Sequence, residues 1–199
     1  MSSTPGPGRL HRLRWTTPDP AAVADRLRRH GIETRDDVVA LGPLTIRLVA
    51  GPADRLAVDD EPRHLDGVVV ARGWSVLAVA WATVDVERAA AETEAVPGDR
   101  RLRDATLGGS VVLVGGLPVA VALLEPDTEG RLAAMLARHG EGPIGIYALH
   151  AAPADAVFRD QGPFGRQRLL ALSSAPWAPL VLHVEPPRSG VAAAATIRS

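Results

Sequence analysis

The chain has 199 residues and a formal net charge of −1, and 46% of its residues are hydrophobic but only 4% aromatic. It has no cysteine, which excludes disulfide bonds and thiolate metal sites and favours a reducing, cytoplasmic location. The 22 basic residues are all arginine, a bias typical of GC-rich, actinobacterial-type genomes. Arginines and acidic residues are interspersed, which predicts no nucleic-acid partner. No apolar run approaches the ~18 residues of a membrane helix, so no membrane partner is expected.

The first elements after a flexible lead, residues 1–9, are a strand and a helix that occur twice in the chain. Residues 10–16 and 75–82 alternate apolar and polar side chains like half-buried strands. Each strand is followed by an acidic residue, Asp19 or Asp85, that can cap a helix. Three short strands are predicted after each helix, at 36–41, 44–50 and 53–59, and again at 103–107, 110–115 and 118–124.

The last third of the chain begins after a predicted helix at 128–138. It contains a strand at 143–149, a stub helix from Pro153, and strands at 166–172 and 179–185. The final residues, 188–199, are expected to form a flexible tail.

The chain repeats itself at an offset of 66 residues. Trp15 falls on Trp81, and Leu41-Gly42 falls on Leu107-Gly108. Strand, helix and three strands in tandem predict an α+β fold of βαβββ modules, with curved mixed sheets and helices on their outer face. The modules are predicted at 10–73, 74–140 (with the extra helix) and 141–187 (shortened).

Three segments carry a family resemblance: residues 79–85 (VAWATVD), 121–126 (VALLEP) and 136–143 (LARHGEGP). In this order they resemble the vicinal oxygen chelate superfamily, which includes glyoxalases, bleomycin-resistance and other antibiotic-sequestering proteins, extradiol dioxygenases and methylmalonyl-CoA epimerases. The resemblance implies that paired modules curl into a cup. Catalytic members hold a divalent metal there, with His on first strands and Glu or Gln on last strands.

The metal-ligand positions that the resemblance implies hold no ligand side chains in this sequence. The first-strand position falls on Arg12, Ala78, and Ile144 or Gly145. The last-strand position falls on Leu56, Ala122, and Leu182 or His183. His11 and His183 would reach ligand positions only if the register shifted by one residue, which needs a bulge. We therefore expect no metal and no other cofactor.

The candidate ligand-binding residues lie on the predicted concave face. Arg12 and Arg14 suit a small organic anion, and Ala78 and Ala80 would leave room for its apolar body. The alternative is a solvated sheet face with no ligand.

Three further residues have both a functional and a structural interpretation. Tyr147 can line the cup or belong to the core, and Trp177 can form a hydrophobic lid or anchor a turn. His150 follows a strand near the expected opening; it is a candidate general base or a simple loop histidine.

The sequence leaves three functions open. The first is a metal-independent protein that binds or converts a small, anionic organic molecule, in secondary metabolism or antibiotic sequestration. If it is an enzyme, we expect a lyase- or isomerase-type activity. The second is a metal-dependent lyase, epimerase or dioxygenase of the same superfamily, and the third is a non-catalytic interaction protein. Because an odd number of modules leaves one without an internal partner, we expect a homodimer joined through the first modules.

Overall fold

The computed structural model describes residues 11–60, 70–93, 97–115, 119–151, 156–173 and 177–187. The predicted lead 1–9, the tail 188–199 and the start of the stub helix at Pro153 lie outside these ranges. The elements are, in chain order, β1 (Arg12–Thr17), α1 (Pro20–Arg29), β2 (Val38–Leu41), β3 (Leu44–Ala50), β4 (Arg55–Val58), β5 (Ser75–Ala82), α2 (Val86–Ala91), β6 (Pro97–Asp104), β7 (Gly109–Val114), β8 (Val121–Pro126), α3 (Arg131–His139), β9 (Gly142–Leu149), β10 (Asp160–Gly162), β11 (Gly165–Leu170) and β12 (Leu180–Val184).

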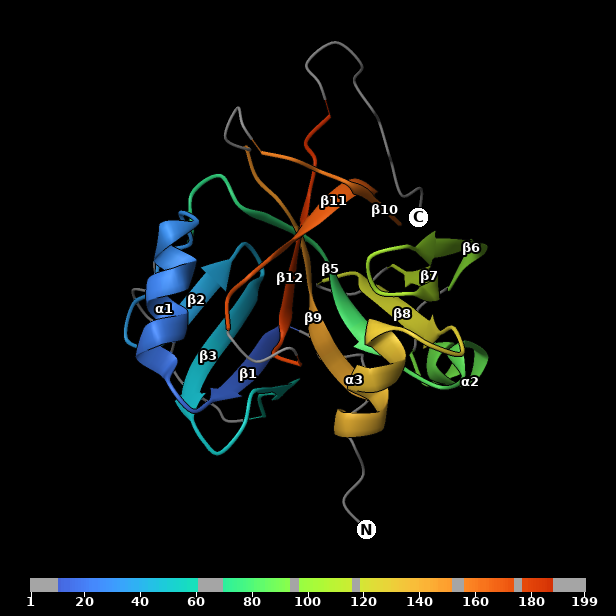
Figure 1. Ribbon diagram of the computed structural model, residues 1–199, viewed down its shortest axis with the longest axis horizontal. Helices are drawn as coiled ribbons and strands as arrows, with labels where there is room; N and C mark the ends of the chain where they lie inside the picture. The colour runs from blue at the N-terminus through green and yellow to red at the C-terminus, as the bar shows by residue number, and fades with distance from the viewer. Residues whose placement is uncertain are drawn as a thin grey trace.

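The strands form two mixed sheets, which confirms the predicted α+β class (Figure 1). Four strands, in the order β2-β3-β1-β4, make the first sheet, drawn in blue and cyan. The other eight make the second, in the order β10-β11-β12-β9-β5-β8-β7-β6. None of the helices in the described ranges is long and apolar enough to cross a membrane.

The eight-stranded sheet contains the second and third copies of the repeat side by side. Residues 75–126 have the expected βαβββ order, and β5 runs parallel to β8 with Trp81 opposite Leu123. The third copy repeats this arrangement, because β12 runs parallel to β9. The two copies join where β5 and β9 pair antiparallel, with irregularities between Val76 and Ala78 and between Ala80 and Trp81. As expected, the middle and last copies pair within the chain.

The first copy departs from the expected strand pairing. The strand parallel to β1 is β3, and β4 pairs antiparallel with the other edge of β1, as β9 does with β5. Residues 31–38, which the offset of 66 places over β6, form no long strand. Asp36 and Asp37 have φ values of 49° and 62°, a left-handed conformation that interrupts an extended segment. Because this strand is missing, β3 takes the place beside β1 that β8 takes beside β5. β4 then takes the place on the other side of β1 that β9 takes beside β5.

The two tryptophans of the repeat occupy corresponding places. Trp15 and Trp81 are both buried in one core, which joins α1 and one face of the four-stranded sheet to α2 and one face of the eight-stranded sheet. The helices begin where the sequence predicts. The Asp19 side chain accepts a hydrogen bond from Ala22 N at 2.9 Å, and Asp85 accepts one from Arg88 N at 2.8 Å. Such caps stabilise a helix by about 1 kcal/mol each.

The opposite face of the eight-stranded sheet is the inside of a curl. Asp104 on β6 bonds to Tyr147 on β9, although three strands separate β6 from β9 in the sheet. The two sheet edges also meet, because Ala105 N after β6 donates to Gln161 O on β10 at 2.9 Å. A second core fills this interior, and Leu132 and Met135 of α3 belong to it.

Candidate functional site

The interior of the eight-stranded sheet is where the family resemblance places a metal. Ala78, Ala122 and Leu182 face this interior, and each is 0% exposed. His183 lies on the opposite face of β12, so the shifted register that would have made it a ligand does not occur. Hydrocarbon side chains cannot coordinate a dication, so these positions do not fit a metal. Among the described residues, no group of three or more His, Cys, Asp or Glu side chains could hold a metal ion.

The interior is packed with the protein's own side chains. Ala78 and Ala80 share the inner core with Leu132 and Met135 of α3 and are fully buried. The space that small residues were expected to leave for a ligand is therefore part of a packed core, to which strands and α3 both contribute.

Tyr147 belongs to a buried polar cluster inside the same curl. Its hydroxyl donates to Asp104 Oδ2 at 2.6 Å, and the Asp104 Oδ1 atom accepts from Leu107 N at 2.9 Å. Gln167 Nε2 donates to Asp104 Oδ2 and to Thr106 Oγ1, both at 2.8 Å. Burial, and then the neighbouring Asp104 carboxylate, raise the pKa of Tyr147 well above its usual value. The phenol is thus a neutral donor that joins β6 to β9.

A second group of chemistry-bearing side chains lies on the outer face of the eight-stranded sheet. We call it the seam cluster, and it consists of Trp74, His150, Phe158, Arg168 and His183. The Trp74 and His150 rings stack with centroids 4.5 Å apart and 14° between their planes. Phe158 meets the His183 ring edge-on at 5.1 Å, and the Arg168 guanidinium lies 5.3 Å from the Phe158 centroid.

Hydrogen bonds fix the protonation of His183. Its Nε2 atom lies 3.0 Å from the His150 carbonyl oxygen, which can only accept. Its Nδ1 atom lies 3.2 Å from Arg168 Nε, which can only donate. His183 is therefore neutral, with its proton on Nε2. Burial lowers its pKa most, and the charges of Arg168, His150 and His30 lower it further, against the opposing bond to the His150 carbonyl.

Two donors of the seam cluster lack acceptors. Trp74 is only 5% exposed, yet its Nε1–H has no hydrogen-bond partner among the residues that the structure describes. The terminal nitrogens of Arg168 pair with no carboxylate in the part of the chain that the structure describes. His30, at the end of α1, has its pKa lowered by burial and then by Arg168 and Arg29. The surroundings of the cluster are thus rich in positive charge and in hydrogen-bond donors.

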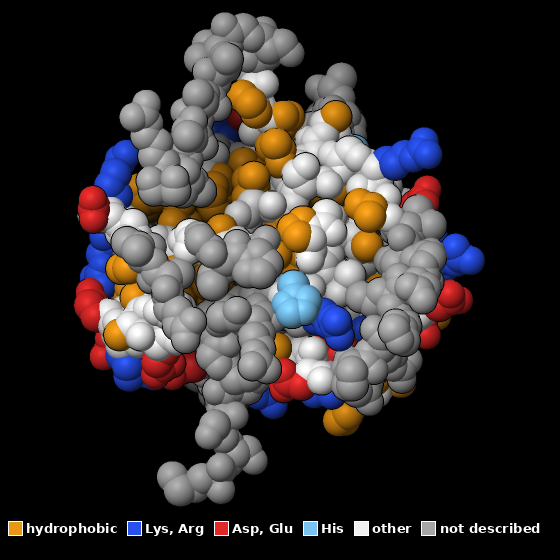
Figure 2. Space-filling view, turned by 180° about the vertical axis from the view of Figure 1, so that it is seen from behind, with side chains coloured by type: hydrophobic (Ala, Val, Ile, Leu, Met, Phe, Trp, Pro, Cys, Tyr) orange, Lys and Arg blue, Asp and Glu red, His pale blue; other side chains and the backbone are white. Residues whose placement is uncertain are grey.

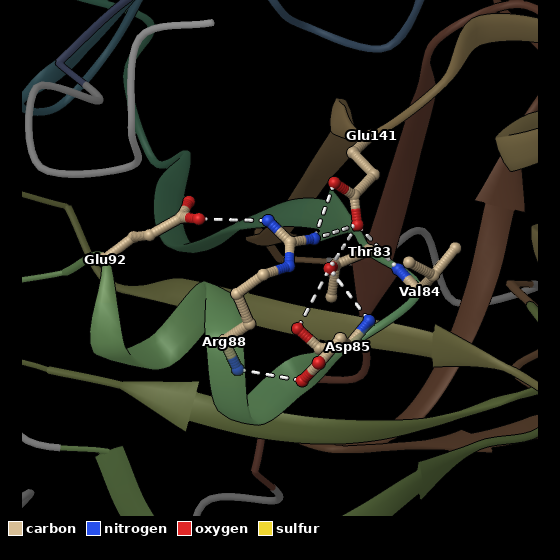
Figure 3. A network of polar contacts seen from close by, with 6 residues as sticks. All are labelled: Thr83, Val84, Asp85, Arg88, Glu92 and Glu141. Atoms are coloured by element: carbon tan, nitrogen blue, oxygen red, sulfur yellow. Dashed lines mark hydrogen bonds and ion pairs between the residues drawn. The ribbon is translucent and has the colours of Figure 1, made fainter.

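A third polar network is structural in character (Figure 3). Glu141, just before β9, accepts hydrogen bonds from Thr83 Oγ1 at 2.7 Å and Val84 N at 2.8 Å, and both of its oxygens contact Arg88 Nη2, at 2.6 and 2.7 Å. Burial opposes ionisation of Glu141, but these hydrogen bonds outweigh it and lower its pKa. The network fastens the start of α2 to the third copy of the repeat.

The candidate site residues that we predicted from the sequence do not form one site in the structure. Arg12 and Arg14 lie on the four-stranded sheet, on the face opposite Trp15, whereas Ala78, Ala80 and Tyr147 are buried inside the other sheet. Arg14 is exposed, so a solvated sheet face describes its position better than a cup lining. His11 is exposed just before β1.

The other two predicted site residues, His150 and Trp177, lie in two further places. His150 points to the seam cluster and not to the interior that contains Tyr147. Trp177 lies beside the end of α3, where its carbonyl oxygen is 3.1 Å from His139 Nε2.

The sequence reasoning missed Trp74, Arg168, Asp104 and Gln167. One signal was available for Trp74, because a tryptophan next to a predicted strand is conspicuous in a chain with so few aromatics. No sequence signal pointed to Asp104 and Gln167, because a single polar residue in a short strand is as common on a solvent-exposed face as in a buried cluster.

No protein-family model matches the chain, and no curated protein matches it in sequence. Among solved structures, it is similar to a methylmalonyl-CoA epimerase from Mycobacterium tuberculosis, with 16% identity, a TM-score of 0.48 and coverage of 62% of this chain and 96% of that one. It is also similar to a hypothetical protein from Bacillus halodurans, with 15% identity, a TM-score of 0.46 and coverage of 60% and 99%. A mutant 4-hydroxymandelate synthase from Streptomyces coelicolor matches with 14% identity, a TM-score of 0.42 and coverage of 88% and 69%. At these values the likenesses carry no conclusion about chemistry. The strand order and register of the eight-stranded sheet agree with the paired, curled modules that the resemblance to the vicinal oxygen chelate superfamily implies.

Proposed function

We propose that this chain is a metal-independent, cytoplasmic protein that binds a small organic anion on a vicinal oxygen chelate scaffold. The observation that supports the proposal is the contrast between its two polar regions. The interior offers alanine and leucine at the implied ligand positions and is filled by side chains. The seam cluster offers instead the Trp74 N–H, which has no acceptor among the described residues, and the partly exposed Arg168 guanidinium. Neither binding nor conversion of this molecule requires a divalent metal ion.

The distribution of charge supports a local rather than a general attraction for anions. The net charge of the chain is only −1, and several surface arginines pair with carboxylates, such as Arg103 with Asp127 at 2.6 Å and Arg101 with Glu125 at 2.9 Å. Charged side chains gather along the outline of the face in Figure 2, and hydrophobic ones are visible nearer its middle. With a net charge this small, attraction for an anion depends on the local arrangement of donors rather than on the charge of the whole chain.

The experiment uses 8-anilinonaphthalene-1-sulfonate, an amphipathic aromatic anion whose fluorescence rises on binding. We expect the folded, purified chain to bind it saturably, with the same dissociation constant with and without EDTA. Elemental analysis of the same sample should find less than stoichiometric transition metal. Loss of binding in EDTA, restored by one added divalent metal, would favour the metal-dependent lyase, epimerase or dioxygenase. Absence of saturable binding to the native chain would favour a non-catalytic interaction protein.

A further inference from the structure

The geometry points to the seam cluster as the anion-binding site of this protein, a place that the resemblance does not indicate. We propose that the acidic group of an aromatic anion, a carboxylate or sulfonate, accepts hydrogen bonds from the Trp74 indole N–H and the Arg168 guanidinium. This inference rests on the proposed function and names the site and the ligand class. It differs from the site selected by sequence, which placed the anion on Arg12 and Arg14.

The strongest support is the unpartnered indole of Trp74. A buried N–H without an acceptor destabilises the fold, because it has lost its hydrogen bond to water, so folded proteins rarely leave one. Trp74 cannot turn freely to find a partner, because its ring stacks on His150 and contacts the His183 ring at a centroid distance of 5.2 Å. The ring can keep its place when an acceptor binds, but the buried Nε1 atom becomes reachable only if side chains around it move aside.

Arg168 supplies the charge that makes the acceptor an anion. Its Nε atom is held by His183 Nδ1, which fixes the plane of the guanidinium and leaves the terminal nitrogens available for a fork-shaped contact. The charges that perturb His30 are both positive, Arg168 and Arg29. An incoming anion therefore meets cationic groups from α1 and from β11.

The neighbouring rings favour a flat apolar body on the same ligand. The His150 ring is partly exposed and is backed by the Trp74 ring, while Phe158 and His183 are buried beneath them. Aromatic side chains and imidazoles pack well against planar rings. Gly73, next to Trp74, adds no side chain over His150; a Cβ there would lie 3.4 Å from two of the imidazole ring atoms.

The test compares two probes that differ by one charge: 8-anilinonaphthalene-1-sulfonate and the neutral N-phenyl-1-naphthylamine. We expect Arg168→Gln to weaken binding of the sulfonate about tenfold or more, because a charge-assisted bond is lost, and to leave binding of the neutral probe unchanged. Trp74→Phe keeps one stacking ring but removes the N–H donor together with part of the ring surface, so it should weaken the sulfonate severalfold; the neutral probe reports the loss of ring surface alone. Arg14→Gln is the control, since it removes an exposed arginine of the other sheet and should change neither constant.

The possible results separate this inference from the proposed function. If both seam variants bind the sulfonate as tightly as the parent, and EDTA has no effect, the seam is not the site although the function stands. If only Arg14→Gln weakened sulfonate binding tenfold, the anion site would lie on the four-stranded sheet and the inference would be wrong. Should Arg168→Gln fail to give the parent circular dichroism spectrum, Trp74→Phe decides alone, and an unchanged sulfonate constant there overturns the inference.

Discussion

Replacing Tyr147 by Phe removes one oxygen atom from the interior of the eight-stranded sheet. The aromatic ring stays, including its edge-on contact with Phe164 at a centroid distance of 5.2 Å. What disappears is the 2.6 Å hydrogen bond to Asp104 Oδ2, which leaves that buried carboxylate with Gln167 and Leu107 as its donors.

The size of the effect follows from the charge and burial of the acceptor. Hydrogen bonds to charged groups contribute about 1.5–3 kcal/mol, and Asp104 is 0% exposed, so water cannot replace the lost donor. We therefore expect the free energy of unfolding to fall by about 1.5–3 kcal/mol. For a chain of this size, about 2–4 °C of melting temperature correspond to each kcal/mol, which gives a decrease of about 3–12 °C.

Urea unfolding at pH 7, followed by tryptophan fluorescence and by circular dichroism, measures this change. A double-mutant cycle with Asp104→Asn isolates the pair, and we expect a coupling energy above about 1 kcal/mol. A loss below about 0.5 kcal/mol would refute the assignment of Tyr147 to a structural cluster. The alternative, that Tyr147 lines a ligand pocket, would show instead as weaker probe binding at unchanged stability.

Three other predictions concern the same molecule. A Cβ atom at Gly162 would overlap the Gln167 amide oxygen, so Gly162→Ala should lower the unfolding free energy by about 1–3 kcal/mol in urea; an unchanged midpoint would show that the amide can move aside. The pKa values of His30 and His183 are lowered in the folded state, so the unfolded chain takes up protons first, and stability that is full above pH about 6.5 should decline from there toward pH 5. Urea midpoints should therefore decrease as the pH falls from about 6.5 to 5, and midpoints that do not change with pH would contradict the histidine assignment. Light scattering at micromolar concentration should give twice the monomer mass if first modules pair, and a monomer would count against the dimer.

Local features of this protein could be predicted from the sequence alone. The helix caps Asp19 and Asp85 depend only on residues close to them in the chain. The same holds for the face of its own strand on which each of Trp15 and Trp81 lies. Strand alternation also predicts that Leu182 and His183 lie on opposite faces, but the sequence left open which of them faces the interior, and only the structure shows that it is Leu182. Such patterns are set by backbone geometry over a few residues, so they can be predicted without knowing which distant segments pack against them.

Strand partners and buried clusters were decided only by the tertiary structure. β4 takes the free edge of β1, and α3 fills the interior above Ala78 and Ala80, because each choice buries apolar surface that comes from distant parts of the chain. The seam cluster likewise gathers Trp74, His150 and Arg168 from three segments separated by two helices and several strands. No local pattern links these residues. Their approach is the result of closing one curled sheet and packing it against another, and it exists only when both are complete.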